Sequence, residues 1–189
     1  MPYFSKVNKL NDFAFKRIFG HEANKDILAG FLSDTLGEEI KPEDIVLENT
    51  ELSASQITKK MPRLDIFVNK IRDNKIIDRI DIEVHLDDAI ALKNQVLFYW
   101  GKGFTGDLRK GQSYNELPRM VSILIGSFNL GVVSPEAALF HDTFHVRSDI
   151  TGKLYNDKLE LHIINLKNLP SVEEGQLGAV IERNPLAPW

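Results

Sequence analysis

Two segments of the sequence combine alternating apolar residues with acidic ones. In residues 64–68 (LDIFV), Leu64, Ile66 and Val68 face one way and Asp65 and Phe67 face the other. This period of two is typical of a half-buried strand. Residues 76–86 (IIDRIDIEVHL) repeat the pattern and place Glu83 and His85 on the polar face. Because a short connection usually joins antiparallel neighbours, Asp65 and Glu83 can approach each other across the strand pair. The pattern therefore indicates a carboxylate site.

Charge is distributed unevenly along the chain. The 23 Lys and Arg against 27 Asp and Glu give a net charge of −4, which excludes a uniformly basic nucleic-acid-binding protein. Residues 76–88 hold five acids and one base, whereas residues 52–75 hold six bases and two acids, and residues 89–110 hold four bases and one acid. One interpretation is a carboxylate site between stretches that attract phosphate. The other is a set of solvated faces, in which Asp81 and Asp87 are surface acids or salt-bridge partners.

The composition excludes several classes of site. With 43% hydrophobic and 26% charged residues, the chain is typical of a globular protein. The absence of cysteine excludes disulfides, thiolate zinc sites, iron–sulfur clusters and cysteine nucleophiles, so only carboxylate, histidine or backbone oxygen can hold a metal. The N-terminus MPYFSKVNKL lacks the apolar segment of a signal peptide, and no window has the ~20 apolar residues of a membrane helix. We expect a cytoplasmic protein with no membrane partner.

Further elements must position the two acidic strands. Gly37 can end a helix in the left-handed conformation, and Asn24 can cap the start of the same helix. Glycines in residues 89–110 predict a long helix that bends or ends early. We expect one domain of the α/β (α+β) class over residues 1–189, in which helices flank a central mixed sheet. The predicted helices are 11–20, 24–37, 89–110 and 172–183. The predicted strands are 45–52, 64–68, 76–86, 121–125, 140–146 and 159–166. Residues 53–61 are predicted to be a loop.

His141 and His145 have the i, i+4 spacing of helical zinc ligands. They fall, however, in residues 140–146, which alternate as a strand does. We therefore predict a structural role for both histidines.

Several motifs together resemble the Rpn family of recombination-promoting nucleases and transposases, which belongs to the PD-(D/E)xK nuclease superfamily. The motifs are NDFAFKRIFG, PRLDIFV, IDIEVHL, LFYWGKGF and FHDTFHV followed by LELHIINL. Their order and spacing carry the resemblance from Asp12 to Leu166. It implies a restriction-endonuclease-like core. Proteins that resemble this family commonly continue beyond the point where PLAPW ends this chain, which is consistent with C-terminal truncation.

The resemblance implies particular metal ligands. Asp65 corresponds to the Asp of the first motif strand and Glu83 to the Glu of the Glu-x-Lys element. The backbone carbonyl of Val84 commonly completes the site. Magnesium, or another divalent cation, prefers oxygen ligands and retains several waters, so this set is sufficient for it. Such a cation assists phosphodiester hydrolysis by lowering the pKa of water and neutralising charge in the transition state.

The third motif position departs from the superfamily pattern. His85 stands where many members carry lysine and Rpn-like members often carry glutamine. His85 could orient or deprotonate the water, ligate the metal, or mark an inactive protein. Lys93 could supply the missing cation, and Asp12 could add a carboxylate. Arg63, Lys93 and Lys102 are the expected DNA contacts.

Three functional hypotheses follow. The leading one is a metal-dependent DNA endonuclease linked to recombination or mobile-element transposition, with catalytic residues Asp65, Glu83 and His85 and with DNA as its partner. A homodimer would supply two sites for cutting both strands. The alternative is a catalytically inactive DNA-binding or regulatory relative. The third is a protein-interaction module or an antitoxin-like partner.

Overall fold

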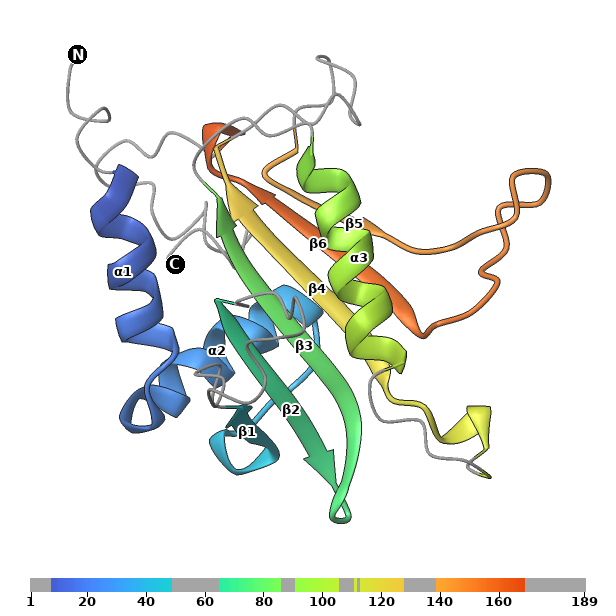
Figure 1. The fold of residues 1–189 in the computed structure, drawn as a ribbon, viewed down its shortest axis with the longest axis horizontal. Helices are drawn as coiled ribbons and strands as arrows, with labels where there is room; N and C mark the ends of the chain where they lie inside the picture. The colour runs from blue at the N-terminus through green and yellow to red at the C-terminus, as the bar shows by residue number, and fades with distance from the viewer. Residues whose placement is uncertain are drawn as a thin grey trace, which may run out of the picture.

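The protein forms a six-stranded mixed sheet with helices on both faces (Figure 1). The computed structural model describes residues 8–48, 65–85, 91–105, 111, 113–127 and 139–168. The predicted α/β architecture is confirmed, whereas the predicted loop 53–61 and helix 172–183 lie outside the described residues. The elements are α1 (Asn8–Phe19), α2 (Lys25–Leu36), β1 (Ile45–Glu48), β2 (Ile66–Arg72), β3 (Lys75–His85), α3 (Ala91–Thr105), β4 (Arg119–Gly126), β5 (His141–Phe144) and β6 (Leu159–Asn165), with short 3₁₀ turns at Glu22–Asn24, Pro42–Asp44, Tyr114–Glu116 and Leu166–Asn168.

The strand order is β1-β2-β3-β4-β6-β5. β4 pairs in parallel with β3 and with β6, and the other neighbours are antiparallel. Asp73 and Asn74 form the tight turn between β2 and β3, with φ values of 51° and 59°. Positive φ at both central residues matches the turn that suits the twist of a hairpin. The predicted antiparallel pairing of the two acidic strands is confirmed.

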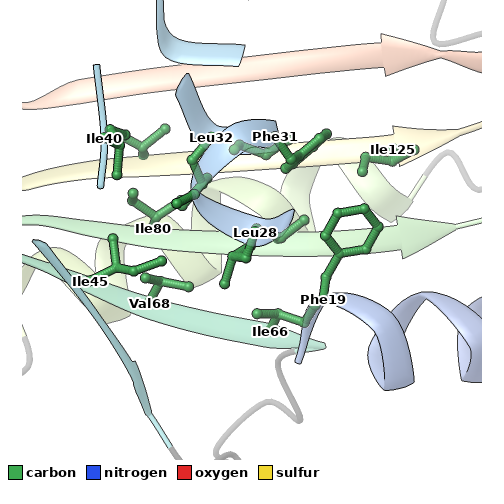
Figure 2. Packing of buried hydrophobic residues seen from close by; sticks show 14 of the residues in the cluster. Phe19, Leu28, Phe31, Leu32, Ile40, Ile45, Ile66, Val68, Ile80 and Ile125 are labelled. Atoms are coloured by element: carbon green, nitrogen blue, oxygen red, sulfur yellow. The ribbon is translucent and has the colours of Figure 1, made fainter. Parts of the chain in front are cut away.

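The main core lies between the sheet and the first two helices (Figure 2). Four apolar residues of β2 and β3 that alternate with the acids, Ile66, Val68, Ile80 and Ile82, point into it and are at most 2% exposed. Phe19 packs at 5.4 Å from Phe31, measured between ring centroids, and thereby joins α1 to α2. Burying one face of these strands fixes their register, because a one-residue slip would turn every side chain over. The buried members include Phe19, Leu28, Phe31, Leu32, Ile45, Ile66, Val68, Ile80, Ile82, Val121, Ile123 and Ile125.

α3 covers the opposite face of the sheet, and Val96 packs there against Leu124 of β4. Gly103 lies so close to β4 that a Cβ atom at this position would be 2.6 Å from the side chain of Met120. The glycine thus permits close packing of α3 on the sheet. The helix ends at Thr105, earlier than the predicted 110, and residues 106–110 lie outside the described part of the chain.

Two predicted helix ends differ in detail from the structure. α1 begins at Asn8, three residues before the predicted start. The Asn24 side chain does not cap α2 but donates a hydrogen bond to the Ile18 carbonyl oxygen at 2.9 Å, which ties the end of α1 to the start of α2. Gly37 ends α2 with φ 67°, as predicted.

A buried polar network lies on the α2 face of the sheet, at the end where β4 begins. Arg119 pairs with Asp78 and with Glu160, at 2.9 and 3.0 Å. The other Glu160 oxygen lies 2.7 Å from His162 Nε2, and His162 Nδ1 lies 2.8 Å from His141 Nε2. His141 therefore has the predicted structural surroundings, and the network joins β3, β4, β5 and β6.

The pH dependence of folding should report on this network. Burial and the neighbouring charge of His162 lower the pKa of His141 from 6.5 to about 4. Between these values the unfolded chain binds more protons than the folded one, so we expect the free energy of unfolding to fall as the pH decreases from about 7 to 4. In the His141→Gln variant, the free energy of unfolding should decrease by about 1–2 kcal/mol less over this pH range than in the wild type. The difference is smaller than the pKa shift alone would give, because the imidazole is partly exposed.

Urea unfolding at pH 7, 5.5 and 4 measures the effect, and His21→Gln is the control because His21 is exposed. At lower pH, Glu160 should add a further loss of stability. Burial alone would raise its pKa, but hydrogen bonding to His162 and the charge of Arg119 lower that pKa to about 2. Parallel pH profiles for the wild type and His141→Gln would contradict the prediction.

Candidate active site

The two predicted catalytic carboxylates lie on neighbouring strands. Asp65 directly precedes β2, and Glu83 is near the end of β3. Ile66 pairs with Ile82 in the antiparallel register. The ladder ends at this pair, and Asp65 lies one residue beyond it. The Asp65 carboxylate accepts a hydrogen bond from the amide of Val84, the residue that follows Glu83, so the two acids lie close together.

Asp65 is held in place at both carboxylate oxygens. Its Oδ2 atom accepts a hydrogen bond from the backbone amide of Val84 at 3.0 Å. Its Oδ1 atom lies 2.7 Å from Nζ of Lys16, which comes from α1. The Asp65 side chain is only 11% exposed, and a carboxylate this enclosed needs such charged or hydrogen-bonded partners. The structure thus brings α1, β2 and β3 together at this one side chain.

Glu83 is buried next to Asp65. Its side chain is 8% exposed, with Oε2 3.5 Å from Nε2 of His85. The Oε1 atom is buried without a hydrogen-bond partner. Burial raises the pKa of Glu83, the contact with His85 lowers it, and the charge of Asp65 raises it again. An enclosed carboxylate with an unpartnered oxygen is a suitable ligand for a cation.

A third acid, Asp81, lies deeper in the same face of β3. Asp81 was predicted to be a surface acid or a salt-bridge partner, and the first of these is wrong, since the residue is 1% exposed. Its Oδ1 atom has no hydrogen-bond partner. Burial, and then the charges of Glu83 and Asp65, raise the pKa of Asp81 well above its ordinary value. Asp81 pairs in the sheet with Ser122, whose Oγ atom is also buried without a partner. Asp87 lies outside the described residues.

α3 packs over the face of β3 that carries Asp81 and Glu83. Arg79, on the same face of β3 as Glu83, donates a hydrogen bond to the Gly103 carbonyl oxygen at 2.8 Å. The Tyr99 hydroxyl accepts a hydrogen bond from Gln95 at 2.9 Å. Burial raises the pKa of Tyr99, and the charge of Glu83 raises it further. Tyr99 therefore lies within the electrostatic field of the carboxylates.

The donor set fits a hard divalent cation. Asp65 and Glu83 both offer carboxylate oxygens. Asp65 Oδ1 contacts the Lys16 ammonium, and Glu83 Oε1 is unpartnered. Magnesium is usually held by one or two protein carboxylates and keeps several waters. In the described part of the chain, no group of three or more Asp, Glu, His or Cys side chains could hold a metal ion.

The other predicted site residues lie in different places. His85 and Val84 are beside the carboxylates. Lys93 and Lys102 are exposed on α3, and Nζ of Lys102 lies 5.7 Å from the centre of the Phe98 ring. Arg63 lies outside the described residues, as does the side chain of Asp12.

Lys16 was not among the site residues predicted from the sequence. The residue lies within the predicted helix 11–20, between aromatic residues that pack into the core. One signal could have indicated Lys16. The third motif position holds His85 instead of a lysine, whereas the motif NDFAFKRIFG contains one.

A family model described as PD-(D/E)XK nuclease family transposase matches residues 9–179. The chain belongs to this family. The resemblance found in the motifs is confirmed, and the family places the protein among nuclease-type hydrolases with a nuclease or transposase role. No curated protein and no solved structure matches the chain. Among the described residues, no helix is long and apolar enough to cross a membrane.

Burial of Asp81 among acids should reduce stability. We expect Asp81→Asn to raise the free energy of unfolding at pH 8 by about 1–3 kcal/mol, because the amide has nearly the same shape and carries no charge. Urea unfolding of both proteins measures the change. The control is Asp73→Asn in the exposed β2–β3 turn, which should change stability far less. A stability at pH 8 equal to or below that of the wild type would contradict the prediction.

Proposed function

We propose that the protein is a metal-dependent DNA endonuclease that hydrolyses phosphodiester bonds and acts in recombination or mobile-element transposition. The observation that carries the proposal is the placement of Asp65, directly before β2, beside Glu83 of the paired strand β3, with the Lys16 ammonium on Asp65 Oδ1 and an unpartnered oxygen on Glu83. Membership of a nuclease family supports it.

Asp65 and Glu83, with the carbonyl oxygen of Val84, would hold Mg²⁺ or another divalent cation. When bound, such a cation activates water and neutralises charge on the phosphate. The chain orients these ligands before any cation arrives, because the Val84 amide fixes one oxygen of Asp65. Fixed ligands reduce the reorganisation needed at the moment of reaction.

His85 would orient the attacking water or accept its proton, since the imidazole lies beside Glu83 on the same strand face. The exposed residues Lys93 and Lys102 on α3 would contact the DNA backbone, together with Arg63. Such contacts are electrostatic, so DNA binding should weaken as salt increases. Two copies of the chain would cut both strands.

Cleavage of supercoiled plasmid tests the proposal. The wild type should nick the plasmid with Mg²⁺ and not with EDTA, and Asp65→Asn and Glu83→Gln should lower the rate at least about 100-fold. Glu43→Gln, at an exposed acid on the Pro42–Asp44 turn, is the matched control and should cut at the wild-type rate. Circular dichroism checks that each variant is folded. Equal nicking by the wild type and Asp65→Asn would refute the catalytic assignment.

The second candidate is a catalytically inactive relative that binds DNA, and His85 in the third motif position favours it. The same plasmid assay separates the two. Salt-sensitive DNA binding by the wild type without nicking would support the inactive relative. Nicking by the wild type, reduced in His85→Ala, would support the endonuclease. Nicking that increases in His85→Lys would indicate an enzyme weakened by its histidine.

A further inference from the structure

Lys16 makes the direct cationic contact with the Asp65 carboxylate. Its Nζ atom is 2.7 Å from Asp65 Oδ1, a short distance for a charge-assisted hydrogen bond. The Lys16 side chain is 41% exposed, whereas that of Asp65 is 11% exposed. The ammonium group is thus partly exposed to solvent, whereas the carboxylate that it contacts is nearly buried.

The position of α1 accounts for this contact. Phe15 and Phe19 flank Lys16 on the helix, with ring centroids 4.5 Å apart, and both pack into the main core. At the end of α1, Gly20 lies beside the side chain of Ile66, the first residue of β2. Apolar packing therefore anchors the helix next to Asp65, and the lysine does not depend on its ion pair alone for its location.

The other candidate cations are placed differently. The imidazole of His85 contacts Glu83, with the atoms 3.5 Å apart, and lies on β3. Lys93 is exposed on α3, and within the described part of the chain no ion pair joins it to Asp65 or Glu83. Among the described lysines, Lys16 is thus the one for which the structure shows a contact with these carboxylates, although it comes from a helix and not from the motif strand.

We propose that Lys16 is the active-site lysine of this protein, that it occupies Asp65 Oδ1 while no divalent cation is bound, and that it contacts the scissile phosphate once a cation takes that oxygen. This inference rests on the proposed function. An ammonium and a divalent cation repel each other at one carboxylate oxygen, so binding of the second displaces the first. Lysine suits the role, because its flexible stem and three rotatable donors let the charge move to a nearby anion.

The proposal predicts opposite changes in two measured quantities. Removing the ammonium removes a competitor for Asp65, so Lys16→Met should bind Mn²⁺ about two- to tenfold more tightly, as expected for loss of a partly exposed ion pair. The same variant should nick plasmid at least about 100-fold more slowly, because it lacks the charge that contacts the phosphate. A lysine with a merely structural role would weaken both properties together.

The experiment measures Mn²⁺ binding by electron paramagnetic resonance and plasmid nicking on the full chain. The proteins are the wild type, Lys16→Met, Lys16→Arg, Asp65→Asn and Arg17→Met. Arg17→Met is the matched control, since it removes the neighbouring charge from an exposed position of α1, and it should retain wild-type Mn²⁺ affinity. Lys16→Arg should keep part of the nicking activity that Lys16→Met loses.

The outcomes separate this proposal from the proposed function. If the wild type binds Mn²⁺ through Asp65 and cuts DNA, but Lys16→Met binds Mn²⁺ no more tightly or cuts equally fast, the role of Lys16 is refuted and the endonuclease stands. If Asp65→Asn binds Mn²⁺ as well as the wild type does, the metal site is refuted, and the role of Lys16 with it. The proposal is supported only if Lys16→Met both binds Mn²⁺ more tightly and nicks plasmid more slowly than the wild type.

Discussion

Electrostatic repulsion among buried acids is the constraint on which this structure depends. Burial raises the pKa of Asp81 and of Glu83. The charges of Glu83 and Asp65 raise the pKa of Asp81 further, and the charge of Asp65 also raises that of Glu83. The chain compensates Asp65 with a backbone amide and with Lys16. It leaves oxygens of Asp81 and Glu83 unpartnered. A site built in this way favours a positive ion, because the ion would offset charges that the fold only partly compensates.

The rest of the fold supplies the stability that this cluster removes. One face of β2, β3 and β4 is packed by α1 and α2 (Figure 2). On that same face, away from the acids, Arg119 pairs with both Asp78 and Glu160. The sheet thus carries ion-paired acids on one face and, on the other, two acids with an unpartnered oxygen. The contrast is typical of functional sites, which retain strain that the surrounding structure can hold.

Local patterns in the sequence were sufficient to predict the strands that carry the site. The alternation around Asp65 and Glu83 has a period that depends only on backbone geometry, so β2, β3 and their antiparallel pairing could be predicted. Burial of Asp81 could not, because it results from α3 packing over a polar strand face. The partner of Lys16 also depends on tertiary structure, since α1 and β2 are far apart in the chain. The predicted Mg²⁺ ligation, DNA contacts and dimer remain predictions.

The central claim is that Asp65 and Glu83 bind one cation between them. A crystal structure of the full chain with Mn²⁺, with the ion located by its anomalous scattering, tests this claim most directly. We predict one Mn²⁺ ion within about 2.0–2.6 Å of an oxygen of each carboxylate, with the Lys16 ammonium no longer on Asp65 Oδ1. An Mn²⁺ ion bound elsewhere, with the Lys16–Asp65 ion pair intact, would contradict the account.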